Sequence, residues 1–258
     1  MIKILTYNIN GIRAVLKKGF LTWLQQTNAD VIGLQEIKAT ADKIPVKDFE
    51  DLGYHCYFHP AKKPGYSGVA ILSKQKPINI IEGIGNPKFD DEGRVIIAEF
   101  ESFSFLSAYF PSGASSFERH EYKQEFLAHF FEFVKTCPKK LIIGGDLNIC
   151  HQLIDIYDPV GLLQASGFLQ TERKWLCYLL DLGFTDTFRM FNQEPHNYTW
   201  FSYMAGAKQR NLGWRIDYLL TNKNLIPKVK NCLILKEVNF SDHCPVMLTL
   251  KPDLLVKH

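Results

Sequence analysis

The sequence predicts an α/β layered protein, in which two packed β-sheets carry helices on their outer faces. Three observations predict this class. Short apolar runs bounded by Gly, Pro, Asn and Asp recur along the chain, and several are apolar enough to be buried on both faces. Longer segments with helical spacing are interspersed among these runs. No linker or low-complexity tract interrupts the chain, so we expect one domain over residues 1–258.

The apolar runs place the strands. We expect strands at residues 2–7, 31–35, 54–58, 69–73, 95–100, 103–110, 141–143, 198–201, 218–220, 232–235 and 246–250.

Three segments have helical patterns. Residues 20–26 form the first, and residues 117–136 form a longer one with Ser115 as the N-cap of a capping box completed by Glu118. The third spans residues 171–182, and Gly183 ends it in the C′ position.

Bulk properties narrow the function only slightly. The net charge of +3, from 30 basic and 27 acidic residues, permits a local basic face without demanding a nucleic-acid partner. The six cysteines form no Cys-x-x-Cys pair, which favours reduced thiols over disulfides. We interpret His55–His59 as a strand rather than a zinc site. There is no secretory signal and no apolar stretch long enough to cross a membrane, so we expect a cytoplasmic protein without a membrane partner.

Acids, amides and one imidazole stand where predicted strands meet loops. They are Asn8, Glu36, Asp146, Asn148, Asp217, Asp242 and His243. Polar groups at such positions can converge on one end of a sheet without being buried unpaired. This residue set suits a hard divalent metal and an activated water molecule.

Each of these positions also has a simpler interpretation. Glu36 is either a metal ligand, which its context favours, or a solvated acid. Asp146 and Asn148 either point the same way from an extended segment or form a turn, because Gly-Gly-Asp-x-Asn is also good turn chemistry. His243 is either a surface residue after an Asx turn or an imidazole oriented by Asp217.

Seven segments, in chain order, resemble motifs of the exonuclease III family of apurinic/apyrimidinic (AP) endonucleases. They are Asn8-Ile9-Asn10-Gly11-Ile12-Arg13, Leu34-Gln35-Glu36-Ile37-Lys38, Gly65-Tyr66-Ser67-Gly68-Val69, Asp91-Glu92-Gly93-Arg94, Gly145-Asp146-Leu147-Asn148, Gly213-Trp214-Arg215-Ile216-Asp217-Tyr218 and Ser241-Asp242-His243. One such motif is weak, but the ordered set covers nearly the whole chain. The resemblance implies a four-layer α/β sandwich with two mixed β-sheets flanked by helices.

The resemblance also implies an activity and its partners. The expected enzyme is a Mg²⁺-dependent DNA-repair nuclease, with Mn²⁺ as a possible substitute, that cleaves double-stranded DNA 5′ to abasic sites and leaves a 3′-hydroxyl. Activity at 3′ ends, as a 3′→5′ exonuclease or 3′-phosphodiesterase, is expected as well. We expect a monomer.

By matching position, the resemblance gives each site residue a role. Glu36 is the principal Mg²⁺ ligand, and the wider metal site draws on Asn8, Asp146, Asn148, Asp242 and His243. Asp146 aligns or deprotonates the water and is held by Asn148. His243, paired with Asp217, polarises the scissile phosphate, and Tyr109 hydrogen-bonds it. Asp146 and His243 both remain candidates for the general base.

The DNA-facing residues follow in the same way. Trp200, Trp214 and Ile216 match a hydrophobic pocket for the abasic sugar, although without the resemblance the two tryptophans would be assigned to the core. The other expected DNA contacts or supports are Arg13, Tyr66, Arg94, Ser112 and Met204, the last as a wedge. Ser112 stands where many members have Asn or Gln, and Leu162 and Ala165 replace loop asparagines, which predicts altered backbone contacts.

Two other functions are compatible with part of this pattern. A phosphatase or phosphodiesterase acting on lipid or inositol phosphates would share Glu36, Asp146, Asn148 and His243, but it would not need the two tryptophans. A DNA-binding protein without catalysis would not need the intact metal and water residues.

Overall fold

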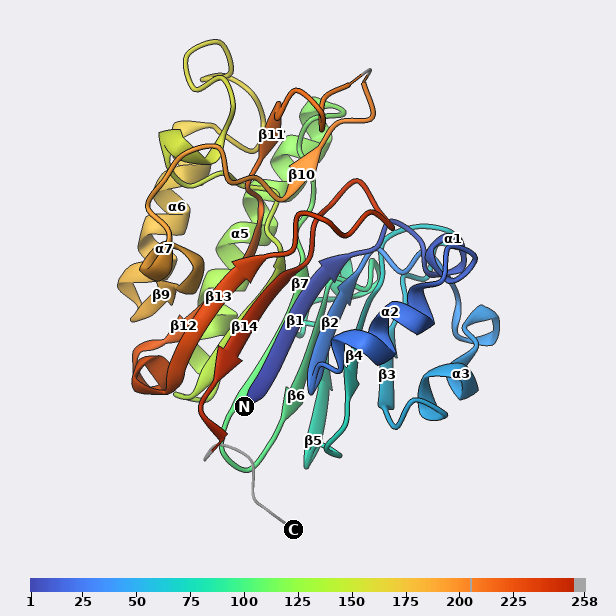
Figure 1. The fold of residues 1–258 in the computed structure, drawn as a ribbon. Coiled ribbons are helices and arrows are strands. Elements are labelled where there is room, and N and C mark those ends of the chain that lie inside the picture. The colour runs from blue at the N-terminus through green and yellow to red at the C-terminus, as the bar shows by residue number, and fades with distance from the viewer. Residues whose placement is uncertain (205, 253–258) are drawn as a thin grey trace.

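Two six-stranded mixed β-sheets form the frame of the computed structural model, which describes residues 1–204 and 206–252 (Figure 1). The first sheet contains, in spatial order, β13 (Val229–Ile234), β14 (Val246–Leu250), β1 (Ile2–Asn8), β2 (Val31–Gln35), β4 (Val69–Ser73) and β3 (His55–His59). The second contains β5 (Asn79–Glu82), β6 (Val95–Glu99), β7 (Ser104–Tyr109), β8 (Leu141–Asp146), β12 (Asp217–Asn222) and β9 (Phe184–Asp186). A short ribbon pairs β10 (Trp200–Phe201) with β11 (Gly213–Trp214).

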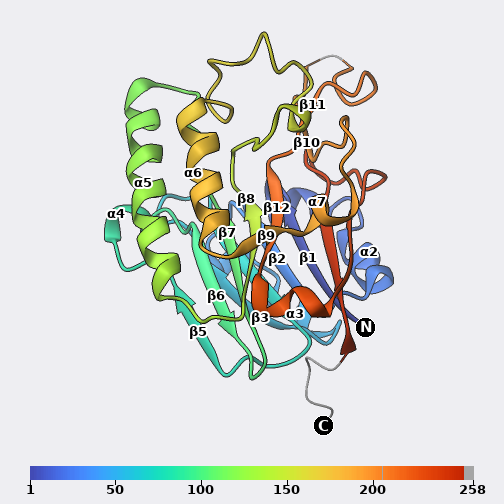
Figure 2. The ribbon, with the colours of Figure 1, turned by 90° about the vertical axis from the view of Figure 1, so that its left-hand side faces the viewer.

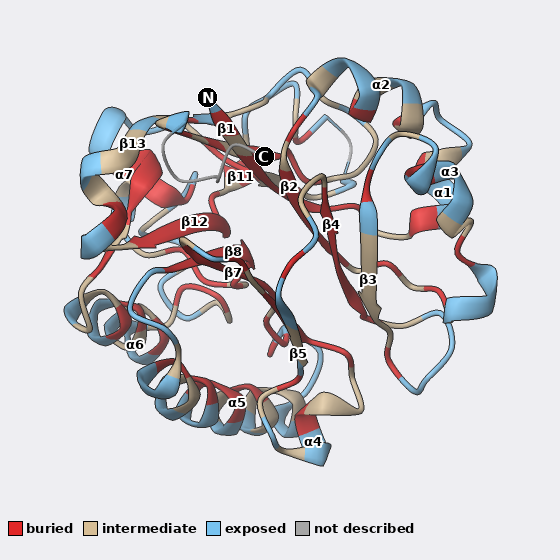
Figure 3. Ribbon diagram, turned by 90° about the horizontal axis from the view of Figure 1, so that it is seen from below, coloured by how far each residue is buried: buried red, intermediate tan, exposed pale blue. Residues whose placement is uncertain are grey.

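Helices cover the outer face of each sheet, which gives four layers (Figure 3). The helices α1 (Ile12–Leu16), α2 (Phe20–Thr27) and α3 (Val46–Glu50) lie on the first sheet. The long helix α5 (Phe117–Thr136) and helix α6 (Gln170–Asp181) run side by side along the second (Figure 2). The shorter helical segments are α4 (Pro87–Asp90), α7 (Thr187–Phe191), η1 (Ala41–Lys43), η2 (Leu153–Asp155) and η3 (Lys223–Lys228).

Each sheet holds one parallel pair of strands among antiparallel neighbours. The parallel pairs are β1 with β2 and β7 with β8. A parallel pair needs a crossover connection, which α1 and α2 supply in the first sheet and α5 supplies in the second. The carboxyl ends of these four strands meet, because Asn8 at the end of β1 hydrogen-bonds Asp146 at the end of β8. The two crossovers thus bring residues far apart in the sequence to one end of the sandwich.

The apolar core lies between the sheets and under each helical layer. Between the sheets, the ring of Phe105 sits against two glycines, because a Cβ at Gly33 or Gly144 would lie 2.9 or 2.8 Å from it. Under α5, Phe126 and Phe130 pack on the second sheet. Strands covered on both sides explain why the predicted runs were continuously apolar rather than alternating.

The structure confirms the predicted strands and helices, with small shifts at their ends. Three short strands, β5, β9 and β11, were missed, as were the helices shorter than eight residues. The predicted capping box was wrong by one position, because Ser116 rather than Ser115 caps α5 and accepts a hydrogen bond from the Arg119 amide. Gly183 follows α6 with a φ of 99°, as its predicted C′ position requires.

Two further observations concern the chain as a whole. All six cysteines are free thiols, as predicted. Within the described residues, no helix combines the length and the apolar character that a membrane crossing requires.

Candidate active site

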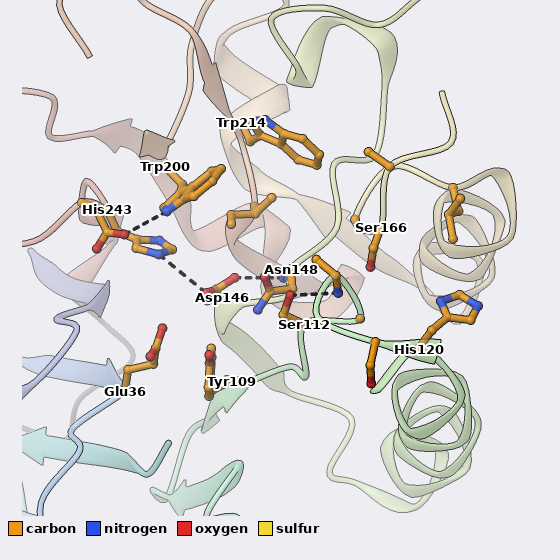
Figure 4. Close-up of a pocket in the computed structure, with 18 of the residues that line it drawn as sticks. Glu36, Tyr109, Ser112, His120, Asp146, Asn148, Ser166, Trp200, Trp214 and His243 are labelled. Carbon is orange, nitrogen blue, oxygen red and sulfur yellow. Dashed lines mark hydrogen bonds and ion pairs between the residues drawn. The ribbon is translucent and has the colours of Figure 1, made fainter. Parts of the chain in front are cut away.

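The strand ends where the two crossovers converge carry the predicted catalytic residues. Tyr109 ends β7 and lies opposite Asp146 in the parallel register, while Asp217 at the start of β12 lies opposite Asp146 on its other side. Glu36 follows β2 directly, and His243 comes before β14. Figure 4 shows Glu36, Tyr109, Asp146 and His243 around one cleft, whose volume is about 910 Å³. Asp217 lies behind His243 and does not line this cleft.

The Asn8 amide joins the two central carboxylates across the sheets. Its Nδ2 donates to Glu36 Oε1 at 2.8 Å and to Asp146 Oδ2 at 2.9 Å. Glu36 also pairs with the Lys38 ammonium at 2.8 Å. Asn8 is fully buried, so it holds the two acids in a fixed relation.

Asp146 is buried among other charges. Burial and the neighbouring Asp217 carboxylate raise the pKa of Asp146 to about 7, against the lowering effects of His243 and the Asn8 amide. A carboxyl group with this pKa can accept a proton near neutral pH.

His243 forms the predicted pair with Asp217. The Nδ1 atom of His243 lies 2.9 Å from Asp217 Oδ2, and Nε2 faces Asp146 Oδ2 at 3.8 Å. Burial disfavours the charged imidazolium, but the Asp217 and Asp146 carboxylates outweigh it and raise the pKa of His243 to about 10. The imidazole is 4% exposed, so the interpretation of a surface histidine is wrong.

Asn148 sits in a turn rather than in an extended segment, which decides between the two interpretations that the sequence left open. Its φ is 50°, and its backbone N–H donates to Asp146 Oδ1 at 2.9 Å. Its side-chain Nδ2 donates to the Phe110 carbonyl at 2.8 Å. Asn148 still lines the cleft, so the turn and the site coincide.

Tyr109 faces the cleft with a cation behind it. The Arg94 guanidinium lies 4.9 Å from the Tyr109 ring centre and donates to the Tyr109 carbonyl at 2.9 Å. Burial and the Glu36 carboxylate hold the pKa of Tyr109 well above its usual range, so the phenol keeps its proton. Arg94 is 2% exposed and does not line the cleft, so its contacts with Tyr109 lie behind the cleft surface.

Three other predicted DNA contacts, Tyr66, Arg13 and Met204, lie outside the cleft. The Tyr66 hydroxyl accepts hydrogen bonds from Arg94 and Arg119. Arg13 is exposed on α1, and Met204 is 78% exposed on the loop after β10. Neither lines the cleft.

The chemistry of the donor set fits a hard divalent cation. Ligand atoms of Glu36, Asp146 and His243 lie within 4.8 Å of one another, which marks a possible metal site within the described residues. A cation there would offset the repulsion that raises the pKa of Asp146. Asp242 is not part of this group. Its carboxylate accepts hydrogen bonds from Asn10 and from the Trp200 indole, each at 3.0 Å.

Trp200, Trp214 and Ile216 form an apolar wall on one side of the cleft. The two indoles meet edge to face, with ring centres 6.1 Å apart. Leu162 packs against this wall, and Ala165 and Ser112 line the cleft. Two of these three departures are apolar: Ala165 adds to the apolar lining of the cleft, and Leu162 belongs to the apolar cluster of the wall without lining the cleft.

A buried ion network that the sequence did not reveal fixes this wall. The Arg215 guanidinium, between the two wall residues Trp214 and Ile216, donates to Asp155 at 2.7 and 3.0 Å and to Asp186 at 2.7 Å. Burial opposes ionisation, but the arginines lower the pKa of Asp155 to about 2. Nothing local in the sequence marks Asp155 as a partner of Arg215, because the two residues lie 60 positions apart.

Comparisons with known proteins agree with this geometry. Residues 5–243 match the Endonuclease/Exonuclease/phosphatase family. An exodeoxyribonuclease of Bacillus subtilis is 38% identical, over 96% of this chain and 99% of that protein. An AP endonuclease from Archaeoglobus fulgidus superposes with a TM-score of 0.89 and 30% identity, covering 97% and 99% of the two chains. The 3′ phosphatase NExo from Neisseria, solved with a product DNA hairpin, superposes with a TM-score of 0.90 and 31% identity, covering 97% of this chain and 100% of that chain.

The chain therefore belongs to the Endonuclease/Exonuclease/phosphatase family. Its relatives and its site also define the class of enzyme within this family. It is a phosphodiester hydrolase of the exonuclease III and AP endonuclease type, a nuclease of DNA repair.

Proposed function

We propose that this nuclease is Mg²⁺-dependent and hydrolyses the phosphodiester 5′ to abasic sites in double-stranded DNA, leaving a 3′-hydroxyl in base excision repair. The observation that carries the proposal is the meeting of an ionisable cluster and an apolar wall in one cleft. The cluster can activate water against a phosphate, and the wall can receive a sugar that lacks a base. We also propose that residues 1–258 act as one domain and as a monomer.

In this proposal the side chains of the cluster divide the work on the water and the phosphate. Asp146 orients the attacking water and takes its proton, and the Asn148 turn keeps the carboxylate in place. The His243 imidazolium, held by Asp217, donates from Nε2 to an oxygen of the scissile phosphate. The Tyr109 phenol donates to the same phosphate. These donors stabilise the negative charge that develops in the transition state.

The metal would be held mainly by Glu36 and Asp146. Bound Mg²⁺ would neutralise phosphate charge and stabilise the leaving oxygen. In the structure the Asn8 amide donates through Nδ2 to both acids, so Asn8 acts by holding them, with Asp242 at the border of the site. With Nδ1 directed at Asp217 and a raised pKa, His243 is better suited to the phosphate than to the metal.

Activity at 3′ ends is the second proposed function. It is supported by the likeness over nearly the whole chain to the Bacillus subtilis exodeoxyribonuclease and the Neisseria 3′ phosphatase. The same cluster would serve it, because a 3′-terminal phosphate or nucleotide presents the same kind of bond.

The experiment that tests the main proposal uses two duplexes of one sequence, with and without a tetrahydrofuran abasic analogue. We expect incision at the analogue in Mg²⁺ and none in EDTA, with the undamaged duplex cut only from its 3′ ends. End digestion of both duplexes without internal incision would leave only the second function. If neither duplex is cleaved, the result would point to a phosphatase acting on other substrates.

Replacing Glu36 by Ala should raise the Mg²⁺ concentration needed for half-maximal rate by about tenfold or more, because a direct ligand is lost. Duplex binding should change by less than about threefold. A Mg²⁺ titration of the rate, with Glu101→Ala at an exposed loop position as the matched control, makes the comparison. An unchanged titration curve would contradict the assignment of Glu36.

Replacing Trp214 by Ala should remove part of the apolar wall and lower kcat/KM for abasic incision by about 10- to 100-fold, an effect of roughly 1–3 kcal/mol. Digestion of undamaged 3′ ends should fall by less. The ratio of the two rates is the measurement, and Trp23→Ala on α2 controls for loss of a tryptophan elsewhere. Equal losses on both substrates would mean that the wall does not recognise the abasic sugar.

A further inference from the structure

Helices α5 and α6 share an ion pair that water does not reach. The Lys123 ammonium lies 2.5 Å from Glu172 Oε1, and both side chains are 0% exposed. Burying two charges is costly, and such pairs are often no more stabilising than apolar residues of the same size. The pair therefore calls for an explanation other than helix packing.

The lysine end of the pair reaches the catalytic turn. The Nζ atom of Lys123 donates to the backbone carbonyl of Asn148 at 2.9 Å. Asn148 holds a left-handed backbone conformation, with a φ of 50°. The bonds to Asp146 and Phe110 hold its N–H and its side chain, so Lys123 is the group that holds its carbonyl.

The glutamate end of the pair holds the loop that closes the cleft beside the apolar wall. Glu172 Oε2 accepts from the backbone N–H groups of Gly167 and Leu169 at 2.6 and 3.1 Å. Gly167 packs so closely that a Cβ there would lie 3.1 Å from the Trp214 ring and 3.0 Å from the Asn148 carbonyl oxygen. The two ends of the ion pair thus hold the backbone of two adjacent segments that line the cleft.

We propose that Lys123 and Glu172 are positioning residues, which lock the Asn148 turn and the 165–169 loop into one rigid unit and thereby set the catalytic rate. Neither side chain lines the cleft, so both act through the backbone that they hold. α5 and α6 supply rigid supports for this contact (Figure 2). This inference rests on the proposed function only for the substrate used to measure the rate.

The test compares Lys123→Met, Lys123→Arg and the double variant Lys123→Met/Glu172→Gln. Because errors of about 1 Å in a site can cost 10²-fold, we expect Lys123→Met to lower kcat by about 10- to 100-fold with little change in KM. Lys123→Arg keeps a donor for the Asn148 carbonyl and should recover part of the rate. The double variant removes the unpaired buried charge, so it provides a folded protein if Lys123→Met does not fold, and its kcat should also be low.

Hydrogen exchange supplies a readout that needs no substrate. Amides in residues 147–151 and 164–169 should exchange about tenfold faster in the double variant, while amides of the first sheet keep their protection. Leu24→Ala, which opens the core under α2, is the control for a general loss of stability and should leave kcat unchanged below its melting temperature.

Three outcomes would overturn the inference. The first is unchanged hydrogen exchange in residues 147–151 and 164–169 of the double variant. The second is an unchanged kcat in the folded double variant. The third is a loss of kcat in Leu24→Ala as large as the loss in the double variant. An inactive wild type on abasic duplex would contradict the proposed substrate instead. The exchange data, with kcat measured on 3′-end digestion, would then still decide the role of the ion pair.

Discussion

Asp146→Asn is expected to lower the rate of abasic-site incision by roughly 10³-fold or more while leaving duplex binding nearly unchanged. The substitution keeps the size of the side chain but removes both the proton acceptor and a charge of the metal site. Single-turnover incision and equilibrium binding to the same duplex measure the two effects. Asp181→Asn, at the exposed end of α6, is the matched control and should behave as wild type.

The pH profile tests the same assignment. Because the pKa of Asp146 is raised to about 7, the carboxyl group is protonated below that pH and cannot accept the proton of water. The wild-type rate should therefore rise with pH through this region, and bound Mg²⁺ should move the rise to lower pH by favouring the carboxylate. If the rate of Asp146→Asn rises with pH in the same way as that of the wild type, the rise must come from the titration of another group.

His243→Gln is expected to cost about 10²- to 10³-fold in kcat, because a charged donor to the phosphate is replaced by a neutral one. The Asp217 carboxylate keeps the pKa of His243 at about 10, so the wild-type imidazolium is present throughout the neutral range. The measurement is kcat at saturating substrate, with the rate falling only as the pH passes about 10.

The Asp217 partner provides the control for this prediction. Asp217→Asn should cost less than His243→Gln and should move the alkaline fall of the rate to lower pH, because it removes the charge that stabilises the imidazolium. The double variant should be no slower than His243→Gln alone, since the two residues act as a unit. Independent, multiplying losses would contradict the pair.

Local patterns predicted most of the frame. Buried strands were visible as apolar runs, and the long helix from Phe117 to Thr136 was visible from its spacing of aromatic residues. The short strand Gly213–Trp214 was not visible, because a two-residue pairing is imposed by its partner Trp200 rather than by its own composition. The cap of α5 was misplaced because Ser115 and Ser116 are equally good N-caps in sequence.

The site was predicted in outline because its residues stand at strand ends in a recognisable order. What the sequence could not supply was the set of contacts across the fold. Lys123 lies in the middle of a helix, and its partner Glu172 is 49 positions away on another, so no local pattern connects them. Arg94 was expected in either of two roles, and only its burial behind Tyr109 favours support.

The most direct test of the account is the identity of the product ends. A strand labelled at its 5′ end, with one abasic analogue at its centre, is annealed and incubated with Mg²⁺. We predict that the first labelled product, before any digestion from its new 3′ end, ends at the nucleotide before the analogue and carries a 3′-hydroxyl that a DNA polymerase extends. A cut on the 3′ side of the analogue, or a product end that must be dephosphorylated before extension, would contradict hydrolysis 5′ to the abasic site.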